Sequence, residues 1–424
     1  MSTGAPEPST TRPPSEGGWF RFGAELPKGG SATDGPEPVG TASAPLGAGG
    51  SSRWDPIPPF RPSGDRDAYD EVIWGADLGL AATTSGPADG PVMAGHGLTP
   101  TGSVPATPPR GRLPETPVEY PQLLRGPTRA RWRPLATLLV FLALFAVLSV
   151  TPFLVAMAYA AVTGVGDIEL WMDEQLAEGA VTEPGGYLFL MFSLIILIPA
   201  AMLSIWAVHR IRPRFLSSVA GGLRWRWLLR CVVVLAPLWV VYLTVSTIVD
   251  PPQSPRSTDW LALLIIGLLL TPWQAAAEEY AFRGWLAQNI GAYFARPMVA
   301  FLVPTVIAAA AFAAAHGSPD PWILADLALF SVVASVMTWR TGGLEAAIVM
   351  HAVNNVGIDI VVSAVGGFDE SLVGAETTSS PLSFAISAAL SLIALGLVLW
   401  QARRRGLDRF YRPTAPRESG LRTS

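Results

Sequence analysis

Residues 266–290 read IGLLLTPWQAAAEEYAFRGWLAQNI, an apolar stretch that carries the adjacent glutamates Glu278 and Glu279 and the arginine Arg283. Burying a carboxylate at membrane depth is costly unless the group is paired or used, so such residues mark a candidate functional site. The stretch belongs to a chain of 424 residues that is 50% hydrophobic and 15% charged, with a mean hydropathy of +0.37. Such values are typical of a membrane protein with several spans.

The charge and the cysteine content exclude other classes of protein. The formal net charge is −4 and the sequence pI is about 5.7, and no basic stripe stands out beyond the arginines that flank apolar runs. Nothing therefore indicates nucleic-acid binding. The single cysteine, Cys231, rules out an intramolecular disulfide framework and a cysteine-rich metal site, and its apolar surroundings predict a core residue.

The composition divides the chain near residue 130. Residues 1–130 are rich in Pro, Gly, Ser and Thr, and such a segment buries too little apolar surface to offset its chain entropy. We therefore predict a disordered tail over 1–130, a transmembrane domain over 131–405 and a short cytoplasmic tail over 406–424. Short apolar segments around Trp19 and Trp74 are either docking motifs for an unknown partner or apolar stretches of a linker without a specific role.

Apolar runs in the second part of the chain predict the fold. Crossing about 30 Å of hydrocarbon takes ~20 residues of helix. Eight runs reach or approach that length, at 135–162, 187–208, 228–249, 260–280, 298–315, 322–339, 344–363 and 382–400. The fold class is therefore all-α, a polytopic membrane bundle of about eight transmembrane helices that follows the long disordered tail.

Charges between the runs predict the orientation of the bundle. Basic residues precede the first run and follow the second and the eighth: Arg129, Arg131, Arg133, His209, Arg210, Arg212, Arg214, Arg403, Arg404 and Arg405. Acidic loops at 167–179 and 368–376 lie on the other side. The positive-inside bias and the even helix number both place the two termini in the cytoplasm, and we expect a multi-pass protein of the cell membrane.

Helix geometry separates the two glutamates. Glu279 and Arg283 are four residues apart, share a helix face and are expected to pair. Glu278 lies about 140° from Arg283 around the axis and is left to face a cavity. A purely structural Glu–Arg pair explains only one glutamate, and the other is a candidate general base.

A second polar stripe occurs in the seventh run. His351 and Asn355 are four residues apart on one helix face, and Asp359 is displaced from His351 by roughly 80°. The chain has four histidines, and a second one, His316, also lies at a predicted helix. A lone buried histidine is usually a satisfied core residue, but two beside an unpaired glutamate favour a functional site.

The depths of these residues agree only in part. If the fourth helix continues to a turn near 295–297, Glu278 and His316 lie ~27 and ~29 Å from that turn and face each other. His351 lies only ~12 Å past Gly343, so it matches that depth only if its helix starts deeper or tilts.

The polar residues form three motifs. Glu278 to Arg283 read EEYAFR and match EExxxR, Phe312 to His316 read FAAAH and match FxxxH, and His351 to Asn355 read HAVNN and match HxxxN. In this order on successive transmembrane helices, the set resembles the CPBP family of type II CAAX prenyl endopeptidases and bacteriocin-processing or Abi-type proteins. The resemblance covers about residues 230–365, a third of the chain.

The resemblance implies an intramembrane endopeptidase that acts on a membrane-embedded or lipid-modified peptide. It implies that Glu278 activates the water, that His316 helps to hold or deprotonate it, and that His351 and Asn355 stabilise the oxyanion. Glu279 and Arg283 would hold the constellation together. Eukaryotic relatives cut the last three residues from prenylated proteins, and maturation of a bacteriocin or another membrane-anchored peptide is an equally open substrate.

The motifs are compatible with two mechanisms, one that uses a zinc ion and one that uses no metal. The family has been described as metal-dependent, and Glu278, His316 and His351 would supply the three protein ligands that a catalytic zinc takes. The asparagine and the Glu–Arg pair fit a metal-free glutamic mechanism at least as well. We favour a site without a cofactor and keep zinc as the alternative.

Two other classes of function use the same polar cluster. Intramembrane Glu, His and Asn also line the ion and proton paths of transporters, although no internal repeat of the kind common in transporters is visible. A non-catalytic membrane scaffold whose tail recruits partners is the other alternative, against which the intact motifs argue. The expected partners are the lipid bilayer and a peptide substrate.

Overall fold

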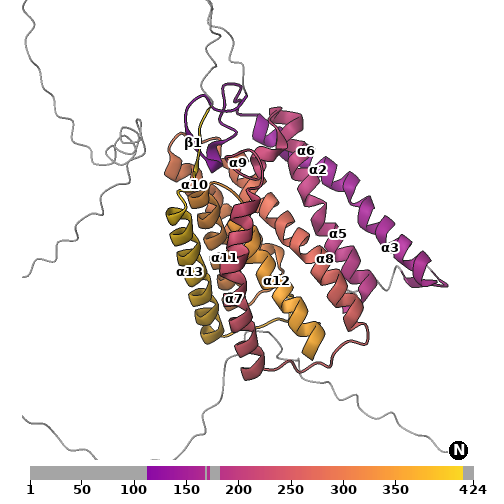
Figure 1. Ribbon diagram of the computed structural model, residues 1–424. Helices are drawn as coiled ribbons and strands as arrows, with labels where there is room; N and C mark the ends of the chain where they lie inside the picture. Colours follow the sequence, from indigo (N-terminus) through magenta and orange to yellow (C-terminus); the bar gives the residue numbers. More distant parts are fainter. Residues whose placement is uncertain (1–111, 168–169, 172–181, 414–424) are drawn as a thin grey trace, which may run out of the picture. The chain divides into compact units, whose positions relative to one another are not determined.

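The computed structural model describes residues 112–167, 170–171 and 182–413. The greater part of the predicted tail, with the short apolar segments around Trp19 and Trp74, and residues 414–424 lie outside these described ranges. Within them, eight helical spans are long and apolar enough to cross a membrane, which confirms the all-α polytopic bundle (Figure 1). The spans run over 133–163, 184–209, 225–249, 260–291, 297–315, 321–341, 345–365 and 381–404.

The first two spans are each broken by a proline. The first consists of α2 (Arg133–Leu148) and α3 (Val150–Thr163), and the second of α5 (Pro184–Ile195) and α6 (Leu197–His209). A proline ring clashes with the carbonyl four residues earlier and removes one helical hydrogen bond. Pro152 and Pro199 stand four residues after the last residues of α2 and α5, so both breaks fall where this clash predicts them.

The fourth span continues past the glutamate pair. This continuation is the condition under which Glu278 and His316 were predicted to lie at similar depths. It consists of α8 (Trp260–Glu279), the π-helical segment η5 (Tyr280–Leu286) and α9 (Ala287–Gly291). It ends a few residues before the turn predicted near 295–297. Single π-helical turns in α-helices are frequent at functional sites, and this one begins directly after Glu279.

The other spans are single helices that surround the end of the fourth. They are α7 (Trp225–Val249), α10 (Pro297–Ala315), α11 (Pro321–Thr341), α12 (Glu345–Val365) and α13 (Pro381–Arg404). α12 packs against both α7 and α8, and α11 packs against α10 and α13. The three motif helices α8, α10 and α12 therefore lie in one neighbourhood.

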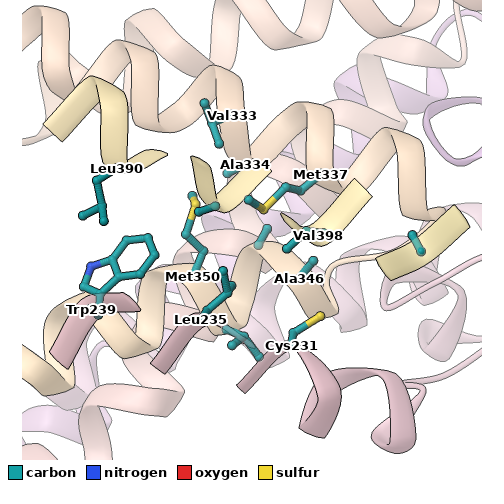
Figure 2. Packing of buried hydrophobic residues seen from close by; sticks show 14 of the residues in the cluster. Cys231, Leu235, Trp239, Val333, Ala334, Met337, Ala346, Met350, Leu390 and Val398 are labelled. Atoms are coloured by element: carbon teal, nitrogen blue, oxygen red, sulfur yellow. The ribbon is translucent and has the colours of Figure 1, made fainter. Parts of the chain in front are cut away.

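The largest buried cluster lies between α7, α11, α12 and α13 (Figure 2). Trp239 and Leu235 of α7 meet Met337 of α11 and Met350 of α12 there. Cys231 is fully buried in the same cluster, which confirms that it is a core residue. This packing fixes α12, which carries His351, between its neighbours.

The predicted boundary of the disordered tail at residue 130 is wrong for residues 112–130. β1 (Val118–Glu119), the short helix η2 (Tyr120–Gln122) and the residues after them pack onto the end of the bundle. Tyr120 and Leu123 are fully buried, and the Tyr120 hydroxyl donates to the Leu216 carbonyl at 2.5 Å. Burial raises the pKa of Tyr120 well above its ordinary value, which keeps this donor protonated.

The predicted C-terminal tail also contributes to the fold. β2 (Phe410–Tyr411) pairs antiparallel with β1, with Val118 opposite Tyr411 and Glu119 opposite Phe410. We call residues 112–132, 210–224 and 405–413 together the cap. The cap includes the short helix η4 (Pro213–Leu216).

The cap covers the start of α12. The Leu344 amide donates to the Ser217 carbonyl at 2.9 Å, and the Val219 amide donates to the Gly342 carbonyl at 2.9 Å. Glu345, fully buried at the first position of α12, pairs with Arg224 at 2.6 Å. α12 therefore begins beneath the cap, in the interior of the protein.

Candidate active site

The pairing predicted for Glu279 is present. Arg283 Nη1 donates to Glu279 Oε1 at 3.0 Å, and both side chains are fully buried. Because η5 begins at Tyr280, the pair bridges the junction between the α-helical and the π-helical parts of the span. A buried guanidinium without a counter-charge is very unfavourable, so Glu279 has a structural task.

Aromatic rings surround the rest of the Arg283 guanidinium. Its Cζ atom lies 4.5 Å from the ring centroid of Phe312, 5.9 Å from that of Phe330 and 6.0 Å from that of Phe282. Cations are attracted to the faces of aromatic rings at such distances. The phenylalanine of the FxxxH motif thus has a physical role, because Phe312 holds the arginine of the EExxxR motif.

His351 lies between the two glutamates. Its Nδ1 is 2.9 Å from Glu279 Oε1, and because a carboxylate accepts, Nδ1 carries the donated proton. Its Nε2 is 3.8 Å from Glu278 Oε2, which is longer than a direct hydrogen bond. His351 is therefore positioned by Glu279 and directed at Glu278.

Amide side chains hold the other oxygen of Glu278. Gln274 Nε2 donates to Glu278 Oε1, and Asn355 Nδ2 donates to Gln274 Oε1 at 3.1 Å. Asn354 Nδ2 donates to Asn355 Oδ1 at 3.0 Å, and Trp239 Nε1 donates to Asn354 Oδ1 at 2.9 Å. The predicted residue Asn355 is thus linked to Glu278 through Gln274, which the sequence analysis missed. Gln274 was detectable as a polar residue one helical turn before Glu278.

His316 caps the end of α10. Its Nδ1 lies 2.8 Å from the Phe312 carbonyl oxygen, and because a carbonyl only accepts, Nδ1 carries the proton. In the neutral ring, Nε2 is then the nitrogen that carries the lone pair. The Phe312 ring contacts both histidine rings, with centroid distances of 4.8 Å to His316 and 6.0 Å to His351.

The four residues that the motifs single out line one cavity of about 560 Å³. Glu278, His316, His351 and Asn355 all contribute to its wall. Much of the remaining lining is apolar, from α5, α6, α12 and α13: Leu190, Leu194, Leu197, Ile358 and Leu390. The structure thus brings together the three motifs from α8, α10 and α12 around one space inside the bundle.

Asp359 lies on the wall of the same cavity but belongs to a separate polar group. The Tyr187 hydroxyl donates to Asp359 Oδ1 at 2.9 Å, and the Thr271 hydroxyl donates to Asp359 Oδ2 at 2.6 Å. The group joins α5, α8 and α12. Asp359 therefore serves helix packing on this wall rather than extending the His351–Asn355 stripe.

Glu278, His316 and His351, the residues proposed as zinc ligands, line the same cavity without forming a compact ligand set. Within the described part of the chain, no three His, Cys, Asp or Glu side chains lie close enough together to hold a metal ion. His351 and Glu278 are also engaged by Glu279 and Gln274. The described residues therefore do not gather the three ligands that a catalytic zinc takes.

The chain is similar over part of its length to a curated protein. The chain is 28% identical over 163 residues to the "Uncharacterized protein YyaK" of Bacillus subtilis strain 168, over 36% of this chain and 52% of that protein. The chain thus spans about half the length of this curated relative. No solved structure matches the chain.

A family model covers the three motifs. Residues 258–357 match the family described as "Type II CAAX prenyl endopeptidase Rce1-like", and the matched segment contains every residue of the EExxxR, FxxxH and HxxxN motifs. The match confirms the resemblance drawn from those motifs. Residues 258–357 of this multi-pass membrane protein are therefore similar to the Rce1-like type II CAAX prenyl endopeptidase family.

Proposed function

We propose that this protein is an intramembrane endopeptidase that hydrolyses a peptide bond of a membrane-anchored or prenylated peptide, with a water activated by Glu278. The observation that carries the proposal is the convergence of Glu278, His316, His351 and Asn355 on one cavity inside the bundle. Peptide hydrolysis needs a base, a positioned water and donors where negative charge develops. These four side chains offer all of these groups in one place.

Glu278 is the base in this proposal. Gln274 donates a hydrogen bond to its Oε1. The other carboxylate oxygen, Oε2, lies 3.8 Å from His351 Nε2. Glu279 does not suit this role, because its side chain is fully buried and does not line the cavity, and its Oε1 accepts hydrogen bonds from Arg283 and His351. The Nε2 lone pair of His316 holds the attacking water or shares in its deprotonation.

His351 and Asn355 stabilise the oxyanion. Asn355 Nδ2 has two N–H groups, of which Gln274 takes one, so the second remains for the substrate oxygen. His351 donates to that oxygen only when Nε2 is protonated, because Nδ1 is engaged by Glu279. Each such donor contributes most in a water-excluded site.

The proposed mechanism needs no metal, and the proposed substrate is apolar. A peptide that carries a lipid group or lies in the bilayer reaches a cavity lined by leucines more readily than a soluble peptide does. We place the protein in the cell membrane with the basic end of the bundle and both termini in the cytoplasm, following the positive-inside bias.

The test is cleavage of labelled prenylated and membrane-anchored reporter peptides by the purified full chain in liposomes. Replacing Glu278→Gln is expected to lower kcat/KM by about 10²–10⁴-fold, the usual range for loss of a general base. Glu376→Gln, an exposed carboxylate in the 368–376 loop, is the matched control and is expected to cleave like wild type. Thermal unfolding of each variant shows whether it is folded.

The same assay separates the alternatives. Activity that survives a chelator supports the metal-free mechanism, whereas activity lost on chelation and restored by zinc contradicts it. If the Glu278→Gln variant keeps full cleavage activity, Glu278 is not the general base. A wild-type protein that cleaves no reporter but carries ions across liposome membranes would be a transporter instead.

A further inference from the structure

A second cavity, of about 680 Å³, lies in the cap and is lined by arginines. Six arginines contribute to its wall: Arg112, Arg210, Arg212, Arg214, Arg224 and Arg412. They come from the three separate segments of the cap. Arginines that only flank transmembrane helices satisfy the positive-inside bias without gathering around one space, so their convergence calls for another explanation. We call this cavity the arginine pocket.

The positive charge of the arginine pocket is largely uncompensated. Arg224 pairs with the buried Glu345 at 2.6 Å, and Arg412 Nε lies 3.8 Å from Asp408 Oδ1. Among the residues that the structure describes, Asp408 is the one acidic residue in the pocket wall. Within the described ranges, no acidic side chain forms an ion pair with the four remaining arginines, which are Arg112, Arg210, Arg212 and Arg214.

Tryptophans place the pocket at the level of the lipid headgroups. Trp206 near the end of α6 is 49% exposed, and Trp225 at the start of α7 is 61% exposed. Trp132 before α2 and Trp400 near the end of α13 are exposed to a similar degree. Tryptophan gathers at membrane–water interfaces. The pocket arginines directly adjoin this belt, because Arg210 Cζ lies 5.6 Å from the Trp206 ring and Arg224 precedes Trp225.

The lining suits a phosphate that carries an apolar group. Guanidinium groups bind phosphate through paired N–H donors, which a compact ammonium group cannot present. Phe215 and Tyr411 form part of the same wall and meet edge to face, with ring centroids 5.8 Å apart. The pocket therefore offers several forked donors beside an aromatic surface.

We propose that the arginine pocket binds a phosphate group, and that the bilayer supplies it as the headgroup of an anionic phospholipid. Basic pockets at the cytoplasmic ends of transmembrane helices are typical sites for such headgroups. A phosphate bound there bridges the three segments of the cap. Because these segments cover the start of α12, bound lipid is expected to stabilise the cap and the bundle beneath it.

The experiment uses the purified full chain in a neutral detergent. The melting temperature is measured with increasing phosphatidylglycerol, and with phosphatidylcholine as the zwitterionic lipid. The pocket variant is R212Q/R214Q, and the control is R403Q/R404Q, which removes the same charge from exposed arginines at the same end of the bundle but outside the pocket. All four arginines are exposed, so both variants are expected to melt like wild type in phosphatidylcholine.

Phosphatidylglycerol is expected to raise the melting temperature of wild type and of the control variant. The pocket variant is expected to need at least about tenfold more lipid for the same shift. Inorganic phosphate and glycerol phosphate form the second arm. No shift with them at millimolar concentration supports the lipid, whereas a shift equal to that of phosphatidylglycerol would assign the pocket to a soluble phosphate.

Three results would overturn the proposal. One is an equal stabilisation by phosphatidylcholine. Another is a pocket variant that responds to phosphatidylglycerol like wild type. The third is a control variant that loses the response as fully as the pocket variant, because the effect would then be general surface charge.

Discussion

At the scale of single residues, two adjacent glutamates have different surroundings and different tasks. Glu279 Oε1 receives hydrogen bonds from Arg283 and His351, and the side chain has no exposure to the cavity or to solvent. Glu278 is 9% exposed, lines the cavity and is held by a neutral amide. Charge balance therefore depends on Glu279, whereas the proposed chemistry depends on Glu278.

This difference predicts that the two glutamates contribute unequally to stability. Glu279→Gln leaves the Arg283 guanidinium buried without a counter-charge and is expected to lower the free energy of unfolding by about 3–5 kcal/mol. Glu278→Gln removes no ion-pair partner of Arg283 and is expected to lower it by about 1 kcal/mol or less. Thermal unfolding of both variants in the same detergent measures the difference. Equal losses in the two variants would contradict the division of tasks.

At the scale of helices, α8 and α12 approach closely on both sides of the site. His351 of α12 reaches Glu279 of α8. About three helical turns before Glu278, the Asp359 carboxylate of α12 lies over Gly267 of α8. A Cβ atom added at Gly267 would lie 2.7 Å from Asp359 Oδ2 and 2.9 Å from its Cγ. The Asp359 side chain is short and is held by Tyr187 and Thr271, so it cannot move aside freely.

Gly267→Ala is therefore expected to destabilise the protein in spite of the better helix propensity of alanine. Overpacking of this kind costs about 1–3 kcal/mol. The matched control is Gly396→Ala in α13, where an added Cβ meets no atom within 4 Å and alanine is expected to be neutral or stabilising. Unfolding of the two variants is compared with wild type. A Gly267→Ala protein as stable as wild type would show that α8 and α12 are less closely packed.

The helices were predictable from the sequence because long apolar runs dominate in a membrane, and the i,i+4 pairing of Glu279 with Arg283 follows from helix geometry alone. The depth of His351 was not predictable by counting residues from Gly343. That count assumes that each helix starts at the membrane surface, whereas α12 starts inside the protein with the buried Glu345 paired to Arg224. The amide network through Gln274 depends on contacts between α7, α8 and α12, which no local pattern reveals.

At the scale of the whole molecule, the cap joins the two ends of the described chain over the start of α12. The composition of residues 112–130 did not predict that they fold onto the bundle, because Pro- and Gly-rich segments are typical of disordered tails. Tyr120 is buried by contacts with distant parts of the chain, among them Leu216, which lies 96 residues away. Trp339 Nε1 of α11 donates to Glu119 Oε2 at 2.6 Å, so the cap is also tied to a transmembrane helix.

Shortening the chain tests how far this cap stabilises the bundle. A chain that ends at Leu407 loses β2, and with it the pairing to β1, the Phe215–Tyr411 ring contact and the Arg409 backbone that packs against Gly342. We expect a free energy of unfolding lower by about 1–3 kcal/mol, from the lost ring packing and backbone hydrogen bonds. A chain that ends at Pro413 keeps all these contacts and is expected to melt like the full chain. Equal melting of both shortened chains would mean that β2 merely rests on the bundle, and that the start of α12 is held by Arg224 and Ser217 without it.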